Sequence, residues 1–487
     1  MKLNKISVNA TTQEVKILLE QEKNISPALK AAIKMMLLLV ETLTGQASLN
    51  SKNSSKPPTD DKNRKRGSSN KNSGKKPGGQ NGRDGVKLKK ADCPDRIETI
   101  SIDKRTLPKG KYKDIGFESR QVFDIEINRV ITEYRAQILE DENGNRFVAE
   151  FPAFVKTDVQ YGSGAKVNSV YMSQFQLLPY NRIQDQFADQ MQLPLSVGTI
   201  FNFNEEAYRL LANFDEIAKE RLAQSNLLHN DETGININKK KYWLHNASNE
   251  RWTYFYPHAK RGSEAMDEIG ILPKFSGVSC HDHWKPYFKY DCVHALCNAH
   301  HLRELTYAEE EENQSWSKEM KELLLEINSA VDKAGGALKK EIADDFRKRY
   351  REIIEKADKT ECQEPKREAS SNKKRGRIKK SKSRNLLERL RDFETETLRF
   401  METDYVPFTN NLGENDIRMT KVQQKISGCF RSIDGAKMFC RIRSYLSTCR
   451  KNNVSATEAL RLLFQGEMPV FITKVVKNYR PNLDIGE

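Results

Sequence analysis

The sequence predicts an α/β protein in which a mixed sheet is flanked by helices and carries a helical insertion. Two observations indicate this class. Residues 226–281 show three short apolar runs, a helical pattern and a fourth apolar run, whereas residues 302–400 are charged and have helical periodicity. A chain of 487 residues is also too long for one compact core, so we expect several domains.

The predicted sheet comes from four segments that follow one another closely. LLHNDET, KYWLHNAS and RWTYFYPHA are the first three strands, RGSEAMDEIG is a helix, and FSGVSCHDHW is the fourth strand. This order fits the front of an RNase H-like fold. Asp231 would then lie on the first strand and Asp282 just after the fourth. Neighbouring strand ends would bring these two carboxylates together, although they are 51 residues apart in the sequence.

A third acid, Glu414, follows in FTNNLGENDIR, where Asn410 and Asn411 are good caps for a helix that continues through GENDIRMTKVQQK. Arg418 falls four residues later on the same face, where it could orient the carboxylate or touch a phosphate. Each acid taken alone has a structural explanation, as a turn residue or as a first-turn acid of a helix. Taken together, Asp231, Asp282 and Glu414 predict a site for Mg²⁺, or Mn²⁺ in its place, acting on phosphodiesters.

Two basic tracts indicate a polyanionic partner. Residues 51–90 and residues 366–391 each carry a net charge of +10, against +15 for the whole chain. Such tracts bind a nucleic-acid backbone through counterion release, although each is also typical of a solvated linker. In the second tract, Lys373, Lys374, Arg375 and Arg377 are the predicted DNA contacts.

All eight histidines lie between His229 and His301. His281 and His283 flank Asp282 and are candidates for proton transfer or phosphate contact, or one of them packs in the core. Lys285 in the same motif is a candidate phosphate contact. A zinc site is conceivable from a C-x4-C-x2-H-H pattern, but its compressed spacing favours structural packing, so zinc is not expected. That pattern comprises Cys292, Cys297, His300 and His301.

The N-terminal third is predicted to contain separate small units. An amphipathic helix over residues 26–45, capped by Ser26 and ended by Gly45, either associates with another copy or packs on a preceding helix over residues 12–23. Residues 95–152 indicate a small β unit, because RIETISI and RQVFDIEI alternate apolar and polar positions. Asn143-Gly144 is a strong hairpin turn in the same unit.

Residues 165–225 are predicted to be helical. NRIQDQFADQMQ, LPLS and VGTIFNFNEEAYRLL resemble a helix-turn-helix with Ser196 capping the second helix, so Thr199, Asn202 and Asn204 would lie near DNA. An ordinary helical hairpin is the alternative.

We therefore expect eight regions along the chain. They are an N-terminal helical segment (1–50), a basic linker (51–90), a small β unit (91–152), a helix-turn-helix-like region (153–225), the first part of the catalytic core (226–308), a helical insertion with the basic tract (309–400), the second part of the core (401–455) and a C-terminal segment (456–487). The start of the chain lacks the apolar stretch of a signal peptide and no run can span a bilayer, so we expect a cytoplasmic, nucleoid-associated protein without disulfides.

At these residues the chain resembles the insertion sequence 66 family of bacterial transposases, which belong to the DDE class. The similarity covers nearly the whole chain, and the NN-x-x-E-x-x-x-R pattern at residues 410–418 is particularly specific. Further motifs that carry it are SSKPP, KPGGQNG, DET, HDHWKPY, CNAHHLREL and KISGCFRSIDGAKMFCRIRSYLSTCRKNN.

The resemblance implies an RNase H-like core whose acidic triad is Asp231, Asp282 and Glu414. Related transposase groups carry a C-x-x-H signature after the second acid, and Cys297 and His300 fit that position as auxiliary residues. The family normally places a zinc-binding domain with paired cysteines after the linker. Here only Cys93 is present, and one thiolate cannot hold a structural zinc ion, so the β unit is expected to lack metal.

The expected function is that of a transposase that binds terminal inverted repeats, hydrolyses a phosphodiester at each end and joins the 3′-hydroxyl to target DNA. Synapsis implies a homodimer or a larger assembly, and accessory proteins of the element are conceivable partners. Two alternatives are a structure-selective nuclease on the same fold and a transposase-derived DNA-binding regulator with an idle triad.

Overall fold

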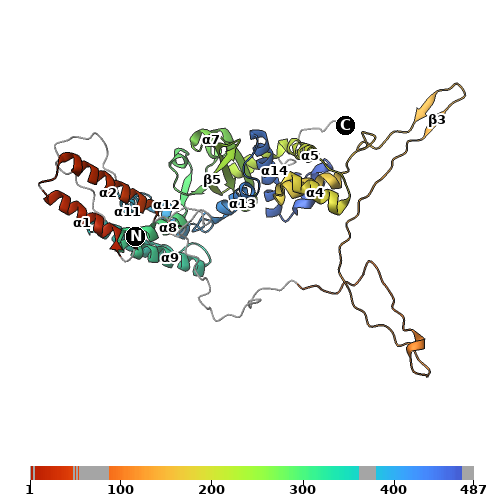
Figure 1. Ribbon diagram of the computed structural model, residues 1–487, viewed down its shortest axis with the longest axis horizontal. Coiled ribbons are helices and arrows are strands. Elements are labelled where there is room, and N and C mark those ends of the chain that lie inside the picture. Colours follow the sequence, from red (N-terminus) through yellow and green to blue (C-terminus); the bar gives the residue numbers. More distant parts are fainter. Residues whose placement is uncertain are drawn as a thin grey trace.

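The computed structural model describes residues 2–3, 6–22, 24–47, 50, 53, 87–360 and 380–473. At its centre lies a five-stranded sheet in the order β7-β6-β5-β8-β9 (Figure 1). The first four strands of this sheet along the chain and the helix α7 (Ser263–Ile269) occur where the sequence predicts them. The strands are β5 (Leu227–Ile237), β6 (Lys240–Ser248), β7 (Thr253–His258), β8 (Val278–His281) and β9 (Val293–Leu296).

The sheet is mixed, as predicted. β5, β6 and β7 pair in antiparallel fashion, and β5–β8 and β8–β9 pair in parallel. Asn238 and Lys239 join β5 to β6 with positive φ angles of 47° and 64°, the conformation of a tight hairpin turn. β9 was not predicted, because a four-residue strand that runs straight into CNAHHLREL has too little pattern to stand out.

The edge strand β7 is covered by the helix α14 (Ile433–Lys451). Hydroxyl groups of α14 accept hydrogen bonds from backbone N–H groups of this edge strand. Phe255 N donates to Ser444 Oγ at 2.8 Å, and Thr253 N donates to Thr448 Oγ1 at 3.1 Å. These bonds block the addition of another strand at this edge. The small hydroxyl residues of SYLSTC therefore protect the sheet.

The predicted helical region after the second acid is present. Its core is apolar and includes Trp316, Tyr350 and Leu390, which are each 0% exposed. The basic tract between α10 and α11 includes Lys373, Lys374, Arg375 and Arg377, and these four residues lie outside the described residues. The helices are α8 (Asn298–Glu312), α9 (Ser315–Ala334), α10 (Lys340–Thr360), α11 (Lys382–Asp392) and α12 (Glu394–Leu398).

The predicted helical region before the sheet is also present, and it packs with α14 and α15 (Ala456–Phe464) in one core. The hydroxyl of Ser196 accepts from Thr199 N at 3.0 Å, as a cap should. A π-helix (Tyr171–Phe175) follows the first helix. The α-helices are α3 (Ser163–Val170), α4 (Tyr180–Met191), α5 (Val197–Leu210) and α6 (Ala212–Ala223).

The predicted β unit is largely wrong. The hairpin at Asn143-Gly144 forms between β3 (Ile138–Glu140) and β4 (Arg146–Val148), with φ +80° at Gly144. The two alternating stretches before it form no strands, and Figure 1 shows them in long arms that project from the body. Ile100 and Val122 are each 92% exposed, so no layer covers the apolar side that alternation requires.

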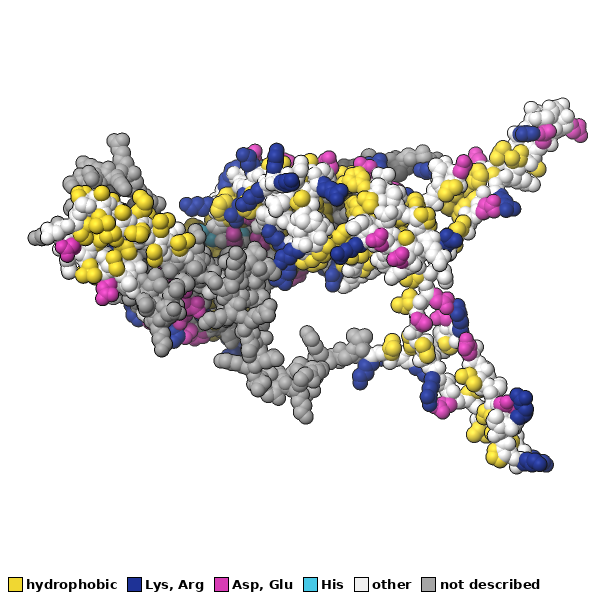
Figure 2. Space-filling model, viewed as in Figure 1, with side chains coloured by type: hydrophobic (Ala, Val, Ile, Leu, Met, Phe, Trp, Pro, Cys, Tyr) yellow, Lys and Arg dark blue, Asp and Glu magenta, His cyan; other side chains and the backbone are white. Residues whose placement is uncertain are grey.

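At the N-terminus, a short β1–β2 ribbon (Lys2–Leu3 and Ile6–Ser7) precedes α1 (Val8–Gln21) and α2 (Pro27–Ala47). Ser26 Oγ accepts from Leu29 N at 3.3 Å, which confirms the predicted cap. The predicted end at Gly45 is wrong by two residues. Apolar side chains gather over this hairpin (Figure 2) although α1 and α2 pack together, and Leu39 and Leu43 remain 57% and 63% exposed.

Candidate active site

Asp231 lies within β5, level with Asp282, which directly follows the carboxyl end of the parallel neighbour β8. In the β5–β8 register His229 pairs with Cys280, and each aspartate lies two residues further along its own strand direction. Asp231 Oδ1 accepts from Glu232 N at 2.9 Å, and Asp282 Oδ1 accepts from Trp284 N at 3.0 Å. The carboxyl ends of parallel strands are where α/β proteins gather ligand-binding side chains.

Glu414 lies in the first turn of α13 (Asn411–Ser427), which packs on β5 and β6. The residue at the helix start, Asn410, does not cap it as predicted, because its side chain holds β5 instead. Asn410 Oδ1 lies 2.7 Å from His229 Nδ1, and Asn410 Nδ2 donates to Asn230 O at 2.8 Å. Asn411 is the first helical residue rather than the cap.

A glycine allows this close approach of helix and strand. A Cβ at Gly413 would lie 3.3 Å from His229 Cβ and 3.2 Å from Asn410 Oδ1, tighter than ordinary contacts. Gly413 O also accepts from Asn246 Nδ2 at 3.1 Å. Glu414 is therefore held close to the sheet by the small residue Gly413 and by the side-chain amides of Asn410 and Asn246, which link α13 to β5 and β6.

The three acids affect one another electrostatically. Burial raises the pKa of Asp231 well above its usual value, and the negative charges of Glu232, Asp282 and Glu414 raise it further. The Asp282 and Glu414 side chains are still 27% and 24% exposed, so they remain accessible from solvent. Carboxylates this close repel one another, and the repulsion destabilises the folded protein. A bound cation would relieve that repulsion.

A fourth acid, Glu232, was missed by the sequence analysis. Its side chain is 1% exposed, and it accepts from the Tyr287 hydroxyl at 2.6 Å and from Arg261 Nε at 2.7 Å. Arg261 Nη2 lies 3.8 Å from Asp282 Oδ2, and its guanidinium lies 4.0 Å from the Trp284 ring centroid. The second acid of the DET motif could have drawn attention to Glu232. Arg261 follows β7 in a segment without a recognisable motif, so no signal in the sequence pointed to it.

Cys297 and His300, at the start of α8, come close to Glu414. Glu414 Oε1 is 3.9 Å from both Cys297 Sγ and His300 Nδ1, and Glu414 Oε2 is 4.0 Å from Arg303 Nη2. Burial lowers the pKa of His300, against the opposing effect of the Glu414 and Asp282 charges. Burial raises the pKa of Cys297 to about 11.

The four residues of the C-x4-C-x2-H-H pattern do not come together as one zinc site. His301 is 2% exposed and its Nδ1 lies 3.0 Å from Asn298 Oδ1. In the described part of the chain, one group of three metal-ligating side chains is found, and it joins Cys297 and His300 to Glu414. Neither Cys292 nor His301 belongs to it.

The two histidines that flank Asp282 differ. His281 is 0% exposed, stacks on Tyr287 at 4.6 Å and has Nε2 3.1 Å from His294 Nδ1, so its assignment as a phosphate contact is wrong. His283 has a positive φ of 72° and its ring lies 4.4 Å from Phe393. Burial lowers the pKa of His283 to about 4, which makes its imidazole neutral near pH 7.

The remaining predicted contacts are spread over the surface. Lys285 is exposed at the start of the 3₁₀-helix η4 (Lys285–Lys289). Arg418 is exposed, and within the described residues no ion pair joins it to Glu414. The arginine that approaches the Glu414 carboxylate is Arg303. Thr199 is half-buried and Asn202 exposed at the start of α5, whereas Asn204 is 0% exposed, so its placement near DNA is wrong.

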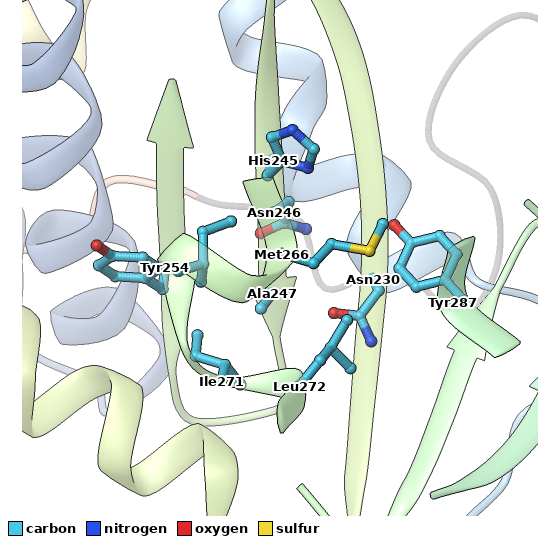
Figure 3. Close-up of a pocket in the computed structure, with 10 residues that line it drawn as sticks. Asn230, His245, Asn246, Ala247, Tyr254, Met266, Ile271, Leu272 and Tyr287 are labelled. Carbon is cyan, nitrogen blue, oxygen red and sulfur yellow. The ribbon is translucent and has the colours of Figure 1, made fainter. Parts of the chain in front are cut away.

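A small cavity is lined by residues of β5, β6, β7, α7 and η4 and of the segment after α7 (Figure 3). Its volume of about 20 Å³ is far below that of a ligand pocket. One of its lining residues, His245, is 5% exposed and its Nε2 lies 3.1 Å from Lys260 O. Burial lowers the pKa of His245 to about 4.

This histidine predicts a pH dependence of stability. The unfolded imidazole takes up a proton as the pH falls through about 6.5, whereas the folded one resists protonation until about pH 4. Stability is therefore lost as pH falls from about 6.5 towards 4, by on the order of 3 kcal/mol for His245. Urea unfolding at several pH values should show a shallower slope for His245→Gln, and an equal slope would contradict the assignment.

The fold and the site define a class: an α/β protein in which acids from a strand, from the end of its parallel neighbour and from a helix come together beside a mixed sheet. Residues 159–438 match the family described as Transposase IS66 family, and residues 4–89 match a family of unknown function (DUF6444). The chain therefore belongs to the IS66 family of transposases, which confirms the resemblance. No curated protein matches the chain. Among the described helices, none has the length and apolar character to cross a membrane.

Proposed function

We propose that this transposase cuts and joins DNA through a divalent-metal site at Asp231, Asp282 and Glu414, on a core of the RNase H type. The observation that carries the proposal is the level placement of Asp231 and Asp282 on adjacent parallel strands, with Glu414 close enough to raise the pKa of Asp231. The strand order, in which the first strand lies between the second and the fourth, supports the same core.

The residues present fit hard divalent ions. Carboxylate oxygens are the ligands that Mg²⁺ and Mn²⁺ prefer, and the negative charges of Asp282 and Glu414 raise the pKa of the buried Asp231, as acids that share a cation site would. When bound, such ions would activate an oxygen nucleophile and stabilise the leaving oxygen. Arg261 is held by Glu232 and points one nitrogen at Asp282, which suits a phosphate contact beside the acids.

DNA contacts would extend beyond the acids. Lys285, Arg303 and Arg418 supply positive charge around the site, and the helix pair α4–α5 offers Thr199 and Asn202 at its second helix for terminal inverted repeats. The tract with Lys373, Lys374, Arg375 and Arg377 would add contacts that do not depend on base sequence. Such a protein would associate with the nucleoid and work with target DNA and any accessory proteins of its element.

The direct test uses full-length protein, Mg²⁺ and linear DNA that carries the ends of its element. Joined molecules with end-dependent nicks are the expected products. Free ends without joining would favour a structure-selective nuclease, and binding without any cleavage would favour a DNA-binding regulator. Either of these outcomes would overturn strand transfer as the function.

Synapsis of two DNA ends requires at least two copies of the chain, and we assign part of that contact to α2. Leu39→Glu with Leu43→Glu places two charges four residues apart on its exposed apolar face, so a dimer should become a monomer. Light scattering after gel filtration measures the mass. Lys34→Glu on the same helix is the matched control and should leave the mass unchanged; an unchanged mass in the double variant would reject this role of α2.

A further inference from the structure

Three different ligand types meet where α8 and α13 begin. Cys297 Sγ, a ring nitrogen of His300 and a Glu414 carboxylate oxygen all lie within 4.8 Å of one another. We propose that these three residues bind one divalent transition ion of the zinc class, distinct in chemistry from the hard ions expected at Asp231 and Asp282. This site goes beyond the proposed function, because it requires no DNA and no catalysis.

The distances are those of ligands around an ion. With Zn–S near 2.3 Å and Zn–N or Zn–O near 2.0–2.1 Å, tetrahedral ligand atoms lie roughly 3.4–3.6 Å apart. Glu414 Oε1 is 3.9 Å from Cys297 Sγ and 3.9 Å from His300 Nδ1. Both separations from Glu414 are therefore within about half an ångström of those around a zinc-sized ion, and the Cys297–His300 separation is no more than 4.8 Å.

A purely structural explanation accounts poorly for these contacts. A separation of 3.9 Å between an imidazole nitrogen and a carboxylate oxygen is too long for a hydrogen bond. His300 Nδ1 is buried and has no hydrogen-bond partner among the described residues. Because a buried polar atom without a partner is costly, its direction towards a thiol and a carboxylate indicates a ligand position.

One backbone N–H group already contacts the sulfur. Asn410 N donates to Cys297 Sγ at 3.1 Å, a backbone N–H···S contact that stabilises a metal-bound thiolate. Asn410 also holds β5 through His229 and Asn230, so the sulfur, α13 and the sheet are fixed together. Three protein ligands leave a fourth tetrahedral position open, as in zinc sites that bind water or substrate.

Ligand softness predicts the selectivity. A thiolate and an imidazole favour zinc or cobalt, whereas an all-carboxylate set favours magnesium or manganese. Glu414 belongs to both sets, so a soft ion at Cys297 would compete with a hard ion that uses Glu414. Zinc should therefore bind to this protein in the presence of millimolar magnesium.

The experiment is a Co²⁺ titration of chelator-treated, full-length protein without DNA, followed by absorption spectroscopy. We expect one equivalent of cobalt to give a thiolate-to-cobalt charge-transfer band together with intense tetrahedral visible bands, both bleached by Zn²⁺. Cys297→Ser should lose the charge-transfer band, and His300→Gln should weaken cobalt binding by at least roughly 10-fold. Cys292→Ser, which changes a half-buried thiol outside the group, should keep both sets of bands.

Absence of a thiolate band in the wild-type protein would overturn the site, whether or not any variant folds. A band that persists in Cys297→Ser would also overturn it. Asp282→Asn separates this inference from the proposed function, because Asp282 is outside the group. The variant should bind cobalt through the thiolate as the wild type does, even though it is expected to lose DNA cleavage.

Discussion

Asp282→Asn should reduce metal-dependent cleavage of DNA ends by at least about 10²–10³-fold, the loss seen when one group that stabilises transition-state charge is removed. The amide keeps the size of the side chain and can still accept from Trp284 N, so the turn after β8 should persist. What it removes is one of the two charges that lie level on β5 and β8. Single-turnover cleavage and joining of end-containing DNA in Mg²⁺ measure the effect.

Two companion variants make that loss interpretable. Asp434→Asn changes an exposed acid in the first turn of α14, which is not one of the three proposed metal ligands, and should cleave at the wild-type rate. Asp231→Asn should be inactive but should melt at or above the wild-type temperature near pH 7, because burial and neighbouring charges already raise the pKa of Asp231. Cleavage by Asp282→Asn at the rate of Asp434→Asn would remove Asp282 from the catalytic site.

The sign of the Asp231 effect follows from linkage. A carboxyl whose folded pKa is raised binds its proton more tightly in the folded state than in the unfolded state. Stability is then lost as the pH rises above the unfolded value near 3.8, so the charge is a cost at pH 7 in the absence of metal. A buried acid that is unfavourable for folding and lies beside two further carboxylates indicates a role in binding.

The sequence predicted the parts of the core that have local periodicity. The strands β5, β6, β7 and β8 and the helix α7 each contain a pattern that is complete within a few residues. Their order was enough to place Asp231 and Asp282 together. Glu414 required one further step, the prediction of a helix start at NNLGE, and the structure gives Asn410 a bridging role there that capping statistics cannot reveal.

What the sequence could not predict depends on contacts between distant segments. Arg261 was missed because its partners Glu232 and Asp282 come together only through the β5–β8 pairing. The alternation in residues 95–127 suggested strands but specifies no covering layer, and the structure provides none. His281 and His283 have similar positions in the motif, and the burial of the His281 side chain becomes apparent only in the folded structure.

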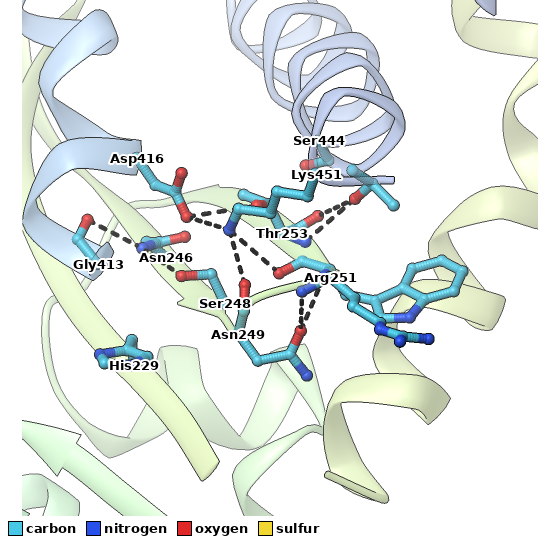
Figure 4. Close-up of polar contacts among 12 residues, drawn as sticks. His229, Asn246, Ser248, Asn249, Arg251, Thr253, Gly413, Asp416, Ser444 and Lys451 are labelled. Carbon is cyan, nitrogen blue, oxygen red and sulfur yellow. Dashed lines mark hydrogen bonds and ion pairs between the residues drawn. The ribbon is translucent and has the colours of Figure 1, made fainter. Parts of the chain in front are cut away.

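Removing one partner of the largely buried ion pair between Asp416 and Lys451 should strongly destabilise this core (Figure 4). Lys451 Nζ donates to Asp416 Oδ2 at 2.6 Å and to Asn249 O at 2.9 Å, and both charged side chains are 16% exposed. Asp416 lies two residues after Glu414 on α13, and Lys451 ends α14. The pair therefore fixes the acid-bearing helix to the turn between β6 and β7.

Lys451→Met should cost about 3–5 kcal/mol of unfolding free energy, because Asp416 is left buried without its cation. A loss of that size lowers Tm by roughly 6–20 °C in a domain of 150–250 residues. Thermal unfolding followed by circular dichroism measures it. Arg461→Met, which breaks the exposed pair with Glu458, is the matched control and should cost less than about 1 kcal/mol.

The double variant Lys451→Met/Asp416→Leu distinguishes a lost attraction from a stranded charge. If the cost of the single variant comes from the unpaired carboxylate, removing that carboxylate should restore most of the lost stability, because apolar replacements of buried pairs are often neutral. A double variant as unstable as the single one would mean that Lys451 contributes through its bonds to Asn249 and Trp252 instead. Because α13 carries Glu414, a restored Tm without restored DNA cleavage would show that this ion pair positions the third acid as well as stabilising the fold.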